Sequence, residues 1–269
     1  LYGEAGKAVR ECETVVAVLG INKSIEREGQ DRYDIQLPAD QREFLQEIYK
    51  VNKNVVVVLV AGSSLAVNWM DENVPAIVNA WYPGESGGTA VAEVLFGDYN
   101  PGGRLPLTYY RSLDDLPAFD DYDVTKGRSY QYYKGDVLYP FGYGLSYTSF
   151  KYSGLKVTED DEYANVSFTL KNAGKRAGDE VAQVYVRLPQ RNEVMPVKEL
   201  KGFERVTLKK GESRNVTIKL RKDQLRYWDE AKGCFIYPSG EYTIMVGASS
   251  ADIRLQGVAI LSNNHTVAK

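Results

Sequence analysis

The chain has 269 residues, of which 43% are hydrophobic and 26% are charged, a composition typical of a folded protein with one large domain or two ordinary ones. Its formal net charge of -3 and its pI near 5.5 argue against a nucleic-acid partner held through phosphate contacts. The longest apolar run, residues 55–61, has the length of a strand, so we expect no membrane span.

Cysteine and histidine are too scarce for several kinds of site. Cys12 and Cys234 form neither a disulfide framework nor a metal-binding spacing. The single histidine, His265, argues against histidine-based metal sites and against Ser-His-Asp catalysis. We therefore expect no metal and no cofactor. The first residues lack the basic start and apolar stretch of a signal peptide, and with no initiator Met the chain is expected to be the later part of a longer polypeptide.

Helices and strands are expected to alternate through the first part of the chain. In order, the patterns predict a helix over residues 5–13, a strand over 14–19, a helix over 40–50 capped by Asp40, a strand over 54–61, a short helix over 65–70, a strand over 76–81, a helix over 89–96 that ends at Gly97, and a candidate last strand over 104–109. Three alternations of strand and helix indicate a parallel sheet with right-handed crossovers.

The loop after the first predicted strand carries the most suggestive chemistry in the sequence. Following Gly20, it contains the charged side chains of Glu26, Glu28, Asp31, Arg32 and Asp34. In parallel α/β sheets ligands bind at the carboxyl ends of the strands, where this loop is expected to lie. Read from the residues alone, solvated loop charges are favoured over a functional site, because charged residues are mostly exposed.

The rest of the chain changes character. Residues 111–147 are irregular and rich in tyrosine, and the seven aromatic residues from Phe119 to Phe141 favour an ordered segment. The stretches that follow have strand character and are separated by turn signals: residues 155–158, 163–171, 180–188, 197–207, 213–220, 241–247 and 253–261. About seven short strands in this span predict an all-β sandwich of immunoglobulin-like type.

Four stretches together resemble glycoside hydrolase family 3, within it the β-xylosidase/β-glucosidase group. They are GINKSIEREGQDRYDIQLPADQ (20–41), VVVVLVAGSS (55–64), AWYPGESGGTAVAEVLFGDYNPGGRLPLTYY (80–110) and YPFGYGLSYTSF (139–150). The resemblance implies an α/β three-layer sandwich with a mostly parallel sheet, followed by an all-β immunoglobulin/fibronectin III-like sandwich. The domains then span 1–110 (α/β, incomplete at its N-terminus), 111–149 (a tyrosine-rich connection), 150–262 (β-sandwich) and 263–269 (tail).

The same resemblance implies a catalytic role for the charged loop. Retaining glycosidases use two carboxyl groups, one as nucleophile and one as proton donor. In the family the nucleophilic aspartate lies on an N-terminal barrel domain, which this chain lacks, and the donor lies on a loop of the α/β domain. The family pattern E-G-x-D-R matches residues 28–32, which makes Glu28 the general acid/base and leaves Glu26 as the competitor. Asp31 and Arg32 are expected to pair and position the loop, and Glu85 to lie at the rim of the site.

The resemblance also bears on substrate and location. It implies a retaining, exo-acting β-glycosidase that takes an oligosaccharide substrate. Within the family a xylan 1,4-β-xylosidase is favoured, because residues 127–133 and 138–141 are similar to the xylosidase branch. A β-glucosidase or an arabinosidase of the same family stays open. So does a non-catalytic, carbohydrate-binding or structural module, because the nucleophile is not in this chain. Enzymes of this type often act outside the cytoplasm, so we expect an extracytoplasmic location.

Overall fold

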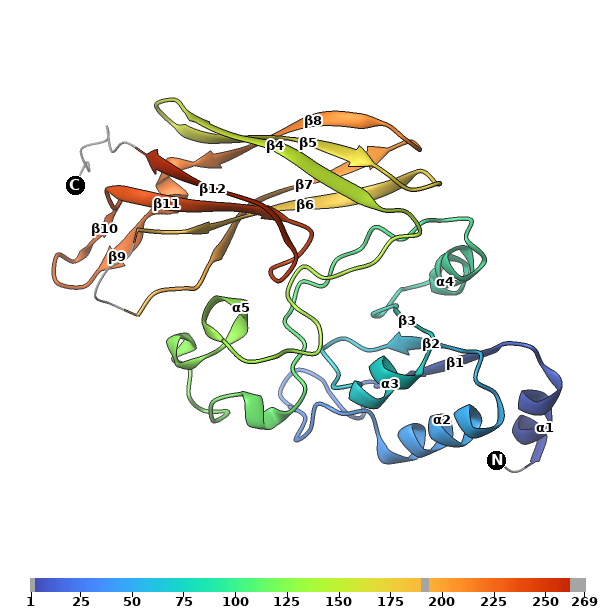
Figure 1. The fold of residues 1–269 in the computed structure, drawn as a ribbon. Coiled ribbons are helices and arrows are strands. Elements are labelled where there is room, and N and C mark those ends of the chain that lie inside the picture. The colour runs from blue at the N-terminus through green and yellow to red at the C-terminus, as the bar shows by residue number, and fades with distance from the viewer. Residues whose placement is uncertain (1–2, 190–193, 262–269) are drawn as a thin grey trace. The chain divides into compact units, whose positions relative to one another are not determined.

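The computed structural model describes residues 3–189 and 194–261, which divide into two compact units (Figure 1). The first unit takes residues up to 99 together with 109–116 and 135–139, and the second takes the others. The predicted connecting segment, 111–149, is therefore shared between the units, and the domain boundaries above remain a prediction. His265 and the tail at 263–269 lie outside the described residues.

A parallel three-stranded sheet forms the centre of the first unit. Its strands, in spatial order, are β1 (Val15–Gly20), β2 (Val55–Val60) and β3 (Ala76–Asn79). The helices of this unit are α1 (Gly3–Glu11), α2 (Ala39–Val51), α3 (Asn68–Asn73) and α4 (Gly87–Phe96). On the central strand β2, Val55 and Val57 are fully buried. The predicted α/β class with a parallel sheet is confirmed.

One face of β1 is open in the described chain. Ala17 and Leu19 point into the core, whereas Val16 and Val18 on the opposite face are 48% and 65% exposed. Strands of parallel sheets are ordinarily covered on both faces. The apolar outer face of β1 is therefore a surface that a further layer of protein would bury.

Two local predictions for the first 110 residues were wrong and one was confirmed. Pro38, not Asp40, precedes α2, and the Asp40 carboxylate accepts a hydrogen bond from the amide of Gln41 within the first turn (2.9 Å). Residues 104–109 form no strand; Pro106 has no N–H to donate to a ladder. The end of α4 at Gly97 is confirmed, with a left-handed φ of 81° that glycine adopts without strain.

The second unit contains a β-sandwich of two antiparallel sheets. One sheet has the order β12 (Ile253–Leu261), β11 (Gly240–Gly247), β6 (Gly178–Arg187) and β7 (Glu199–Leu208). The other has the order β4 (Phe150–Glu159), β5 (Tyr163–Asn172) and β8 (Ser213–Arg221). Each of the seven predicted strands falls on one of these, and the predicted sandwich is confirmed.

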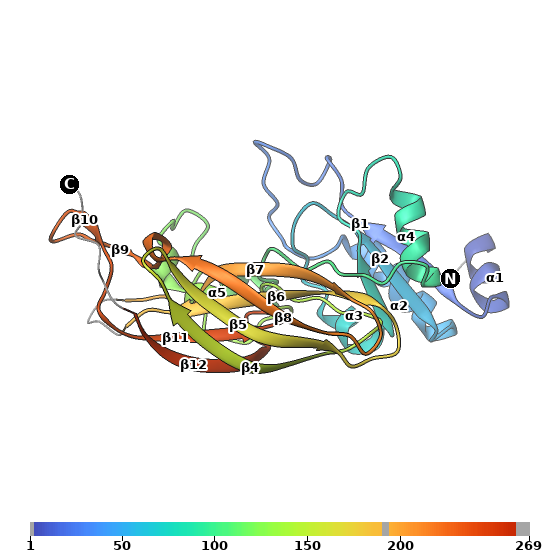
Figure 2. The same cartoon turned by 90° about the horizontal axis from the view of Figure 1, so that it is seen from above.

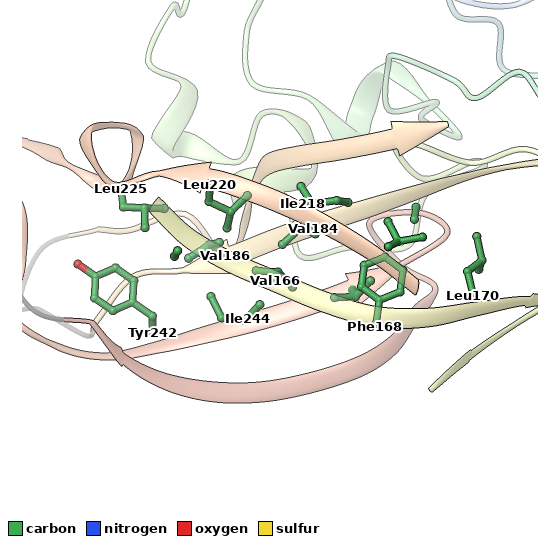
Figure 3. Close-up of a cluster of buried hydrophobic side chains, with 14 of the residues drawn as sticks. Val166, Phe168, Leu170, Val184, Val186, Ile218, Leu220, Leu225, Tyr242 and Ile244 are labelled. Carbon is green, nitrogen blue, oxygen red and sulfur yellow. The ribbon is translucent and has the colours of Figure 1, made fainter. Parts of the chain in front are cut away.

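Alternating apolar side chains from both sheets fill the sandwich (Figure 3). Val166 and Phe168 on β5 face Val184 on β6 and Ile244 on β11, and all are at least 98% buried. Strand side chains alternate between faces, so the period of two in residues 164–170 was sufficient to predict which residues form this core. The hairpin of β9 (Tyr227–Asp229) and β10 (Cys234–Ile236) was missed, because strands of three residues carry too short a pattern.

The tyrosine-rich segment is ordered, as its aromatic content predicted. It contains the 3-10 turns η1 (Leu113–Asp115) and η2 (Val124–Lys126) and the short helix α5 (Ser129–Tyr132). Within the second unit, the ring of Tyr130 stacks on Phe141 with centroids 4.4 Å apart, and its hydroxyl accepts a hydrogen bond from the amide of Leu200 (3.0 Å). Aromatic packing therefore replaces secondary structure as the element that orders this segment.

Candidate functional site

The loops that follow β1, β2 and β3 meet at the carboxyl edge of the parallel sheet. The longest, residues 21–38, extends from β1 (Figure 2). Its origin is fixed by Gln41 of α2, whose side-chain amide both accepts from the amide of Gly20 and donates to its carbonyl, each at 2.8 Å. Gly20 can lie this close to β2 only because it lacks a side chain: a Cβ there would lie 1.9 Å from the carbonyl oxygen of Val60.

Glu26 is the hub of the three loops. Its Oε1 accepts from the amide of Gly62 (3.2 Å) and from the hydroxyl of Tyr82 (3.4 Å). Its Oε2 accepts from the hydroxyl of Ser63 and lies 3.2 Å from Nε of Arg32. Gly62 and Ser63 follow β2 and Tyr82 follows β3, so a single carboxylate joins three loops.

Arg32 closes the long loop from its far side. Its side chain is only 11% exposed, and besides Glu26 it reaches the carbonyl of Ser64 through Nη2 (2.9 Å). The expected partner was Asp31, but Asp31 is exposed and forms no ion pair with Arg32 in the described chain. The prediction of an Asp31–Arg32 pair was wrong, because the Arg32 guanidinium is directed to Glu26 and to the carbonyl of Ser64 instead.

Glu28 lies in a different environment, at an exposed turn over residues 27–30. The amide of Gln30 donates to the carbonyl of Arg27 (2.9 Å), and the reverse bond measures 3.2 Å. Gly29 has a φ of +74° inside this turn, a value that favours glycine. The Glu28 side chain is exposed and has no hydrogen-bond or ion-pair partner among the residues described. The Glu28 carboxyl is therefore free to reach a ligand, whereas both carboxylate oxygens of Glu26 already accept hydrogen bonds from the protein.

Tyr82 approaches Glu26 from a strained piece of backbone. Trp81, directly before it, has a φ of +54°, which is uncommon for a bulky residue. The single proton of the Tyr82 hydroxyl is shared between Glu26 Oε1 and the carbonyl of Ile21, which lies 3.2 Å away. The Tyr82 ring packs so closely on Gly62 that a Cβ there would lie 2.6 Å from Cε2. Glu85, three residues further on, is exposed ahead of α4 and is not brought to Glu26 or Glu28 by any described contact.

A buried tyrosine lies behind the loops. The hydroxyl of Tyr109 accepts from the amide of Asn79 at the end of β3 (3.1 Å). Burial raises the pKa of Tyr109, and the Asn79 amide and the charge of Arg32 act in the opposite direction. The positive charge of Arg32 therefore acts on the loop it closes and on the end of β3 as well.

Sequence reasoning missed the partners of Glu26. Gly62, Ser63 and Tyr82 directly follow two predicted strands, so the topology alone placed them at the same sheet edge as the charged loop. Within the described residues no group of three or more His, Cys, Asp or Glu side chains could hold a metal ion. No helix of the described chain is long and apolar enough to cross a membrane.

Two family models match the chain. Residues 2–147 match the glycosyl hydrolase family 3 C-terminal domain, and residues 180–250 match a fibronectin type III-like domain. The chain belongs to glycosyl hydrolase family 3. The resemblance inferred from the four motif stretches is thereby confirmed, and so is the order of an α/β domain followed by a fibronectin type III-like one.

Relatives in glycosyl hydrolase family 3 include enzymes with two different names. The chain is 42% identical to a xylan 1,4-beta-xylosidase of Xylanibacter ruminicola over 92% of this chain and 31% of that protein. It is 34% identical to a periplasmic beta-glucosidase of Salmonella typhimurium over 94% of this chain and 35% of that protein. The crystal structure of a beta-glucosidase from Kluyveromyces marxianus in complex with glucose superposes with a TM-score of 0.90 at 36% identity, covering 96% of this chain and 33% of that one. The chain spans about a third of the length of these relatives.

Proposed function

We propose that this chain supplies the general acid/base of a retaining, exo-acting β-glycosidase, with Glu28 as the residue that moves the proton. The observation that carries the proposal is the contrast between two carboxylates on one loop. Both oxygens of Glu26 are occupied by donors of the protein itself, whereas the Glu28 carboxyl is exposed and unengaged at the turn. A proton donor must reach the oxygen of the departing sugar, and of these two carboxylates only that of Glu28 is free to do so.

In the first step a carboxylate nucleophile attacks the anomeric carbon while the Glu28 carboxyl gives its proton to the glycosidic oxygen. The bond between that carbon and oxygen breaks, the shortened sugar leaves, and a glycosyl ester remains. In the second step the Glu28 carboxylate takes a proton from water. The water oxygen attacks the anomeric carbon, the ester bond breaks, and the sugar is released with its original β configuration.

The nucleophile is proposed to come from a barrel domain that precedes this chain in the same polypeptide. The span of about a third of its relatives' length supports a larger protein. The open apolar face of β1, with Val16 and Val18, supports a further layer of protein on this unit. Asp31, Arg32 and Glu85 are proposed to position the loop or to contact sugar at its rim.

The proposed substrate is a xylo-oligosaccharide, from which one xylose is removed at a time at the non-reducing end. Similarity to a protein named a xylan 1,4-beta-xylosidase supports this substrate. Similarity to a beta-glucosidase crystallised with glucose supports a β-glucosidase as the second candidate, and an arabinosidase is the third. A pentose lacks the hydroxymethyl group of a hexose, and a binding pocket distinguishes the two by whether that group fits. An extracytoplasmic location is proposed because one relative is named periplasmic.

The test is the turnover of nitrophenyl β-xyloside, β-glucoside and α-arabinoside by the whole polypeptide, with the anomer of the first product followed by proton NMR. We expect the highest kcat/KM on the xyloside and release of β-xylose before mutarotation. A product of inverted configuration would overturn the proposal. The 269-residue chain alone is expected to give no turnover; turnover by it would mean that a second catalytic carboxylate lies within these residues.

A further inference from the structure

We propose that Glu26 is a positioning residue of this site, whose carboxylate holds the turn of Glu28 at a fixed place on the sheet edge. This inference rests on the proposed function and deepens it. Glu26 does not touch the sugar in this account; it acts through Glu28. The loop it serves, residues 21–38, contains no helix or strand of its own, so side-chain contacts must supply its rigidity.

The contacts of Glu26 suit this task because they come from three separate loops. Gly62 and Ser63 belong to the loop after β2, Tyr82 to the loop after β3, and Arg32 to the far end of the same long loop. The Glu26 side chain is 18% exposed and that of Arg32 is 11% exposed, so water competes little for the ion pair between them. Fixing one side chain thereby fixes both ends of the segment that contains the Glu28 turn.

The donor pattern requires a carboxylate at position 26. Each of its oxygens faces two donors: the Gly62 amide and the Tyr82 hydroxyl on Oε1, the Ser63 hydroxyl and the Arg32 guanidinium on Oε2. A carboxylate accepts on both oxygens, whereas a glutamine offers one oxygen and one NH2 group. Whichever way a glutamine is turned, its NH2 meets a group that can only donate, either the Gly62 amide or the Arg32 guanidinium. Glu26→Gln therefore preserves the shape of the side chain, opposes one of these donors and removes the charge that pairs with Arg32.

A single residue, Arg27, separates Glu26 from Glu28, so a displacement of Glu26 is expected to move Glu28 as well. Consecutive Cα atoms are about 3.8 Å apart, and the connection through Arg27 has little slack. A misplacement of about 1 Å at a reacting group costs on the order of 100-fold in rate. Loss of the network is therefore expected to lower kcat, while KM, set by contacts with the sugar, changes little.

The experiment measures xylobiose hydrolysis by the whole polypeptide carrying Glu26→Gln, with Glu43→Gln as the control for an exposed glutamate of the same unit. We expect kcat to fall about 10- to 100-fold for Glu26→Gln with KM within about threefold, and no change for Glu43→Gln. The alkaline limb of the pH–rate profile should persist in Glu26→Gln, because Glu28 still donates the proton. In Glu28→Gln that limb should disappear.

A kcat for Glu26→Gln within twofold of the parent would overturn the positioning role and leave the proposed function intact. Activity unchanged by Glu28→Gln would overturn the proposed function itself, so the two failures are distinct. Loss of the alkaline limb in Glu26→Gln would also overturn the inference, since Glu26 would then be the proton donor.

A second variant covers the case in which Glu26→Gln does not fold. The double change Ser63→Ala and Tyr82→Phe removes two donors and leaves the Glu26–Arg32 ion pair in place. We expect a fall in kcat of about 3- to 30-fold with the alkaline limb retained. A kcat equal to that of the parent, with a parental thermal unfolding midpoint, would contradict the inference.

Discussion

Replacing Glu28 by alanine in the whole polypeptide is expected to slow the hydrolysis of xylobiose by about 10²- to 10⁴-fold, the usual contribution of general acid–base catalysis. A sugar alkoxide is a poor leaving group and needs the proton, whereas nitrophenolate departs readily without one. The rate of the first step should therefore fall much further on xylobiose than on nitrophenyl β-xyloside. Comparison of kcat/KM on the two substrates measures this difference.

The control for Glu28→Ala is Glu43→Ala, which removes an exposed carboxylate from α2. Its kinetics should match those of the parent, and both variants should retain the parental unfolding midpoint, because each side chain lies in solvent. An equal loss on xylobiose and on the nitrophenyl substrate in Glu28→Ala would exclude proton donation as the missing step. The acid would then have to be sought elsewhere on the sheet edge.

Gly20→Ala is expected to disrupt the parallel sheet and, with it, the base of the loop that carries Glu26 and Glu28. The added Cβ would lie 1.9 Å from the Val60 carbonyl oxygen and 2.7 Å from its carbon, and both are backbone atoms that cannot swing aside. Strands β1 and β2 would have to separate at their carboxyl ends, where Ile21 donates to the same carbonyl (3.0 Å). We expect a loss of about 3 kcal/mol or more in the stability of this sheet.

Hydrogen exchange at the amides of β1 and β2 measures that loss without interference from the β-sandwich. The matched control is Gly88→Ala in α4, where a Cβ meets nothing within 4 Å and φ is not positive. There alanine should stabilise the helix by about 0.5–1 kcal/mol, because it restricts the unfolded chain. Parental protection of β1 in Gly20→Ala would contradict this prediction, because it would show that the strand ends accommodate the added Cβ without separating.

The parts of the fold that were predicted from sequence are those in which one periodic pattern decides the structure. The β-branched run at residues 55–60 indicated a strand buried on both faces, and β2 is that strand. Alternation from Ala164 to Leu170 identified the inward face of β5. The prediction of a strand at 104–109 was wrong because these residues make only scattered hydrogen bonds with the distant segment 138–143: Leu105 donates to the carbonyl of Tyr143 (2.8 Å).

The candidate site was predicted in part, and the limit is physical. Position along the sequence located the charged loop at the carboxyl end of β1, since topology determines that edge. It did not reveal that Arg32 pairs with Glu26 instead of Asp31, or that Ser63 and Tyr82 complete the network. Those contacts depend on how three loops fold back over one another, which no local pattern encodes.

The most direct test of the central claim is chemical rescue by azide. Glu28→Ala removes the base that excludes an external anion, so azide should attack the glycosyl ester, restore turnover of nitrophenyl β-xyloside and yield β-xylosyl azide. Glu26→Ala retains Glu28 and should yield none. Formation of β-xylosyl azide by Glu26→Ala, with none from Glu28→Ala, would contradict the account and assign the proton transfer to Glu26.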